Sequence, residues 1–89
     1  MTKPDLQVVP AKPESHGQRV RRLQAEARSL AKEHVGELLS LLGDLCHTAS
    51  EIAEGGDAYP PGIREEARRM ADETEHRVGT IRALSERSL

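Results

Sequence analysis

The stretch LAKEHVGELLSLLGDL, residues 30–45, decides the fold of this chain, because its apolar residues return every three or four positions. That spacing is typical of an amphipathic α-helix, in which such residues share one face. The same pattern continues on both sides of the stretch, from Arg19 to Glu54. We therefore predict one long helix at about residues 16–54, around which the rest of the chain is arranged.

Signals for helix ends flank this long helix. Ser15 and Gln18 have the spacing of a capping box, in which the serine hydroxyl accepts from a backbone amide and the glutamine reaches back. Glycines at 55 and 56 suit the left-handed conformation that closes a helix, and prolines at 60 and 61 suit the start of another. We predict a turn at about 55–60, with Tyr59 packed on Ile63, and a second helix at about 61–87.

The domain organisation follows from these ends. Residues 1–14 hold three prolines and no sustained apolar period, so we predict a flexible leader. Residues 15–89 form a single helical hairpin, because a short connector makes two helices antiparallel neighbours. Aligning the helices at the turn predicts a register in which Ala49 lies near Ala67 and Leu38 lies near Val78.

The apolar face of the long helix is wider than one neighbouring helix requires. On a helical wheel it covers about 160°, whereas contact with one neighbour needs about 100°. We therefore predict an all-α antiparallel two-helix hairpin that homodimerises into a four-helix bundle. The predicted core and dimer interface comprises Val20, Leu23, Ala27, Leu30, His34, Leu38, Leu41, Leu42, Leu45 and Ile52 on the first helix, and Ile63, Met70, Val78 and Ile81 on the second.

Two irregularities interrupt this pattern. Consecutive steps of four from Leu30 to His34 to Leu38 break the heptad spacing, so we expect His34 to occupy an irregular layer of the core. Small residues also line the side of the helix away from the apolar face, where each glycine costs about 1 kcal/mol relative to alanine. We consider a possible second interface there, which comprises Ser29, Gly36, Ser40 and Gly43.

The composition limits the class of protein. The chain is 36% hydrophobic and 31% charged, with a net charge of -2, so no global field attracts nucleic acid or anionic lipid. Cys46 is the single cysteine of the sequence, which excludes an intramolecular disulfide and suits a reducing compartment. No apolar run approaches the roughly 18 residues of a membrane span. We expect a cytoplasmic protein without a cofactor.

One motif resembles a metal site. Glu73 and His76 form E-x-x-H, the spacing that places a carboxylate and an imidazole on one metal in ferritin-like bundles, and Asp44 is a third candidate ligand. Both residues of the motif point away from the apolar face of their own helix, whereas a buried metal site requires ligands that point inward. A metal-binding bundle is therefore our alternative interpretation, and exposed polar residues are the preferred one.

The start of the first helix is basic, with Arg19, Arg21 and Arg22 close together. A nucleic-acid-binding dimer is thus a third interpretation. We do not expect nucleic-acid binding, because no aromatic side chains accompany the arginines for base stacking.

The connector region IAEGGDAYPPGIREEARR, residues 52–69, resembles that of short, uncharacterised helical proteins of alphaproteobacteria. The resemblance implies a bacterial cytoplasmic origin and brings no activity or site residues with it. No nucleophile elbow, glycine-rich phosphate loop or paired catalytic carboxylate is recognisable in the sequence. We therefore predict a non-enzymatic protein-interaction or regulatory module, whose partners are a second copy of itself and a protein not identified by the sequence.

Overall fold

The computed structural model describes residues 12–89, which form a hairpin of two helices. Helix α2 spans His16–Ala53, the short 3-10 helix η1 spans Gly56–Ala58, and helix α3 spans Pro61–Ser88. Within the described residues there is no β-strand, so the predicted all-α hairpin is confirmed. Residues 1–11, most of the predicted leader, lie outside the described part of the chain.

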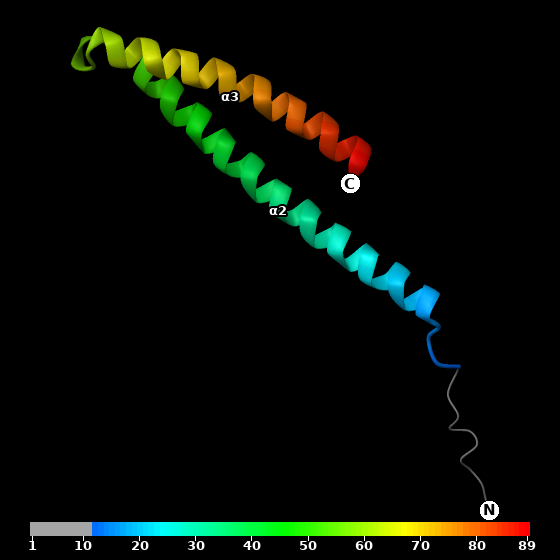
Figure 1. Cartoon of the computed structure of the whole chain (residues 1–89). Coiled ribbons are helices and arrows are strands. Elements are labelled where there is room, and N and C mark those ends of the chain that lie inside the picture. The colour runs from blue at the N-terminus through cyan, green and yellow to red at the C-terminus, as the bar shows by residue number, and fades with distance from the viewer. Residues whose placement is uncertain (1–11) are drawn as a thin grey trace, which may run out of the picture.

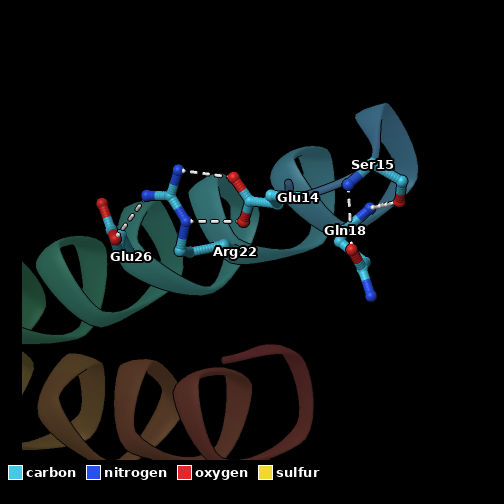
Figure 2. Close-up of polar contacts among 5 residues, drawn as sticks. All are labelled: Glu14, Ser15, Gln18, Arg22 and Glu26. Carbon is cyan, nitrogen blue, oxygen red and sulfur yellow. Dashed lines mark hydrogen bonds and ion pairs between the residues drawn. The ribbon is translucent and has the colours of Figure 1, made fainter. Parts of the chain in front are cut away.

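Helix α2 begins with the predicted capping box. The Ser15 hydroxyl accepts a hydrogen bond from the Gln18 amide at 3.1 Å, and the Gln18 side chain accepts one from the Ser15 amide at 2.9 Å (Figure 2). Both bonds satisfy backbone donors that a helix N-terminus leaves unpaired. The cap therefore sets the first residue of α2.

An ion-pair cluster at the same end of α2 was not predicted from the sequence. Arg22 donates two hydrogen bonds to Glu14, at 2.8 and 3.0 Å, and one to Glu26 at 3.2 Å (Figure 2). The hydrogen bonds from Arg22 hold the pKa of the Glu14 carboxyl below its ordinary value. Because Glu14 precedes the cap, this forked ion pair ties the chain before α2 to the second turn of the helix.

The connector turns the chain back through two glycines with different roles. Gly56 has φ of +78°, a left-handed conformation that residues with a β-carbon rarely adopt. At Gly55 a β-carbon would overlap the ring of Tyr59, so this glycine allows the ring to lie against the backbone. Tyr59 therefore packs on Gly55, and its packing on Ile63, which keeps 53% of its surface exposed, stays a prediction.

The two helices meet along a regular seam. Its members are at least half-buried and recur at steps of three and four: Val35, Leu39, Leu42, Cys46, Ala49 and Ala53 on α2, and Ala67, Ala71, Thr74, Val78, Ile81 and Ser85 on α3. The Cys46 thiol lies 3.6 Å from the Ala71 carbonyl oxygen, to which it donates. This contact places the register within one residue of the predicted alignment.

Within residues 12–89 the buried core consists of three alanines near the turn, Ala49, Ala67 and Ala71. Alanine allows the backbones to approach closely there, whereas the seam farther from the turn contains larger leucine, valine and isoleucine side chains. The helices accordingly lie closest beside the turn and diverge toward the end of α3 (Figure 1). The N-terminal part of α2 extends beyond α3. We call residues 16–28 the overhang, because the Cys46–Ala71 register places the last residue, Leu89, opposite Arg28.

Candidate interaction face

The wide apolar face of α2 is divided between two directions. The seam residues centre about 60° to one side of Leu38 on the helical wheel, and the remaining apolar residues centre about 30° to the other side. Leu38 itself keeps 44% of its surface exposed, while Leu39, which lies outside the predicted face, is half-buried against α3. The hairpin thus covers one half of the apolar face and leaves the other half in solvent.

The exposed half continues from α2 onto α3. It contains nine large apolar side chains, each at least 38% exposed, which we call the open face: Val20, Leu23, Leu30, Leu38, Leu41, Leu45, Ile63, Met70 and Leu84. The three residues on α3 follow at multiples of seven, a spacing that keeps them on one line of the helix. Arg77 occupies the remaining position on that line and pairs with Glu73 at 3.5 Å.

A groove lies between the helices within the open face, beside the turn. Its volume is about 590 Å³. Leu45 and Ile52 line it from α2, and Ile63 and Met70 line it from α3, together with Ala49 and Ala67 of the core. Among its ten lining residues only Thr48 and Glu66 have polar side chains. Such a lining suits an apolar occupant with a basic flank near Glu66.

The structure places most of the predicted interface outside the hairpin core. Four of its members are half-buried between the helices: Leu42, Ile52, Val78 and Ile81. The other ten are exposed: Val20, Leu23, Ala27, Leu30, His34, Leu38, Leu41, Leu45, Ile63 and Met70. His34, expected in an irregular core layer, borders a small surface hollow together with Ala31 and Leu38.

Sequence reasoning did not separate the two halves of the apolar face. The unbroken heptad from Val35 through Leu39, Leu42, Cys46 and Ala49 was the signal that marks the seam. The stutter at His34 belongs to the other set of apolar residues. The long helix carries two apolar repeats, one regular and one interrupted by the stutter. Recognising both repeats would have predicted that its apolar face serves two separate contacts.

The predicted second interface is open in the hairpin. Ser29, Gly36, Ser40 and Gly43 are all exposed. A β-carbon added at Gly36 or Gly43 would meet nothing within 4 Å, apart from the local backbone of the helix. Contacts inside the hairpin therefore do not explain why glycine occupies these positions.

The candidate metal ligands lie on the surface, where Glu73 and His76 border one hollow together with Arg77 and Thr80. Asp44, Glu73 and His76 are exposed, and within residues 12–89 no three His, Cys, Asp or Glu side chains are placed to hold one metal ion. Glu73 instead pairs with Arg77, and the His76 carbonyl accepts a hydrogen bond from Thr80 at 3.2 Å.

Charge is distributed unevenly along the hairpin. The overhang holds four arginines and one glutamate, a net charge of +3 with histidines neutral. The opposite end, residues 44–73, which we call the turn end, holds eight acidic residues and three arginines, a net charge of -5. One end of the molecule is therefore basic and the other acidic, although the whole chain is nearly neutral.

Comparisons with known proteins add no relative: no family model matches the chain, and neither the curated proteins nor the solved structures contain a significant match. Separately, none of the helices in residues 12–89 is long and apolar enough to span a bilayer.

Proposed function

We propose that this protein is a non-enzymatic interaction or regulatory module that acts as a homodimer, in which two hairpins join through their open faces into a helical bundle. The observation that carries the proposal is the imbalance between the open face and the core. Nine large apolar side chains are exposed on one face, whereas the buried core comprises three alanines. Monomeric soluble proteins rarely expose contiguous apolar patches of this kind.

A second copy of the chain is the occupant that best explains the open face. The face is elongated and follows both helices, so another pair of amphipathic helices matches its shape. Two-fold pairing also makes the patch self-complementary, because the same residues are supplied from both sides. We place this dimer in the cytoplasm, where the half-buried thiol of Cys46 would stay reduced.

Sedimentation equilibrium of the full chain tests the proposal. We expect the mass of a dimer at micromolar concentration, and we expect Leu38→Glu to shift the equilibrium to monomer because it puts a charge within the open face. Ser40→Glu is the matched control, since Ser40 is exposed on the opposite side of α2. A folded monomer at micromolar wild-type concentration would overturn the proposal.

The control variant also examines the second interface. If Ser40→Glu dissociates the assembly and Leu38→Glu does not, the chains associate through the side that carries the glycines and serines. That result would replace the open face as the site of association.

A further inference from the structure

We infer that the second copy lies antiparallel to the first, with the basic overhang of each chain seated in the groove at the turn end of the other. This inference rests on the proposed dimer and specifies its direction and register. It concerns one occupant, the overhang of a second copy. Three observations lead to it: the spacing of the α2 stripe, the charges of the two ends and the lining of the groove.

The apolar stripe of α2 sets the register. Its positions are symmetric about Gly36, so that Val20 corresponds to Ile52 and His34 corresponds to Leu38. The complete set is Val20, Leu23, Ala27, Ala31 and His34 before Gly36, and Leu38, Leu41, Leu45, Ala49 and Ile52 after it. Two antiparallel α2 helices that cross their two-fold axis at Gly36 therefore place apolar residues opposite apolar residues along the stripe, except at the stutter, where His34 lies opposite Leu38.

Charge decides between antiparallel and parallel arrangements. A parallel dimer would place two overhangs of net charge +3 side by side, and likewise two turn ends of net charge -5. The antiparallel dimer instead places each basic overhang against the acidic turn end of its partner. Complementary ends attract and like ends repel, so charge favours the antiparallel direction.

The groove at the turn end is the proposed binding site for the overhang of the second copy. Within residues 12–89, α3 does not run alongside the overhang, and residues 16–28 are all exposed. In the Gly36 register this segment runs beside residues 44–56 of the partner subunit, which comprise the end of its α2 and the start of its connector, and beside residues 61–73 of its α3. Val20 and Ala27 then face the apolar groove lined by Leu45, Ile52 and Met70 of the partner subunit. Each end of the assembly becomes a three-helix bundle, and four helices overlap in the middle.

Two arginines of the overhang meet carboxylates in this register. Arg21 and Arg28 continue the heptad line of the seam, and neither is in an ion pair within residues 12–89. Combining the Gly36 register with the Cys46–Ala71 register places Arg21 beside Glu66 of the partner subunit and Arg28 beside Glu73 of the partner subunit. Glu66 already borders the groove. The arginines thus flank the apolar contact on the side of the partner's α3.

Cysteine cross-linking tests the direction. In a Cys46→Ala background, the double variant Val20→Cys/Ile52→Cys should form a covalent dimer on oxidation, which reductant dissolves. Within one chain these positions are about 48 Å apart along α2, too far for a disulfide. The single variant Val20→Cys should give no covalent dimer, because the two Val20 positions lie at opposite ends of an antiparallel pair.

Charge reversal tests the contact between the overhang and the turn end of the second copy. Arg21→Glu/Arg28→Glu should weaken the dimer about tenfold or more, since two pairs are reversed at each end, and adding Glu66→Arg/Glu73→Arg should restore it to within about threefold. Circular dichroism at high concentration checks that the variants stay helical. Efficient cross-linking of Val20→Cys alone, or no rescue by the second pair of reversals, would overturn this arrangement while leaving the dimer intact. A wild-type monomer in sedimentation would overturn the proposed dimer itself.

Discussion

Truncation of Leu41 to alanine examines how much the open face contributes to association. Leu41 keeps 66% of its surface exposed in the hairpin. Complete burial of a leucine side chain is worth about 1.5–3 kcal/mol, so covering the exposed two-thirds contributes about 1–2 kcal/mol per chain. A dimer buries two copies of Leu41, so the contributions of the two chains add. Because alanine retains the β-carbon, we expect the association free energy to weaken by an amount near the lower end of that sum, about 2 kcal/mol, which raises the dissociation constant roughly 30-fold.

The substitution is well suited to this measurement. Leucine and alanine have similar helix propensities, so α2 should be affected little by the change itself. Sedimentation equilibrium at several concentrations measures the dissociation constant, and the concentration dependence of the thermal midpoint provides a second estimate. Ser40→Ala is the control at the adjacent, outward-facing position. Less than a threefold weakening by Leu41→Ala, or an equal effect of Ser40→Ala, would refute the reasoning.

Three further predictions concern the connector, the start of α2 and the metal alternative. Gly55→Ala should lower the thermal midpoint, because the added β-carbon overlaps the Tyr59 ring. In the double variant Gly55→Ala/Tyr59→Ala, the midpoint should fall by less than the sum of the decreases in the two single variants. Strictly additive decreases would contradict the overlap. The pKa of Glu14, followed by carboxyl NMR, should lie below its ordinary value and rise toward it in Arg22→Ala. Because that pKa is depressed in the folded chain, the ion pair should stabilise the fold at pH values above the unfolded-state pKa of Glu14. This stabilisation should be lost as the pH falls through the folded-state pKa. An unchanged pKa of Glu14 in the variant would refute the pairing. Metal analysis of untagged protein should show no stoichiometric metal in wild type or Glu73→Ala, whereas one equivalent lost on substitution would establish the metal-binding alternative.

The helix ends were accessible to sequence reasoning because they depend on local chemistry. The capping box at Ser15 and Gln18 is complete within four residues, and the prolines at 60 and 61 start α3 without help from distant contacts. The contact of the Tyr59 ring with Gly55 was not predicted. The position of the ring on Gly55 depends on the left-handed turn at Gly56, which a comparison of residue spacing does not describe.

The interaction face was accessible only in part. The wheel correctly indicated that α2 has more apolar surface than one neighbour can cover, because amphipathic periodicity is a property of a single helix. It did not indicate that Leu39 turns toward α3 while Leu38 turns away. That choice depends on the angle at which α3 approaches, which the connector and the packing of the alanine core determine together.

The amino-acid sequence by itself determined the two helices, their ends, their antiparallel order and the surplus of apolar residues on α2, since each depends on local hydrogen bonding or helical periodicity. The tertiary structure alone decided which part of the opening stretch, residues 30–45, faces α3 and which part remains open. The physical reason is that three small alanines draw the helices together beside the turn. Their contact sets the rotation of α2, and that rotation leaves Leu38, Leu41 and Leu45 facing outward for a second chain.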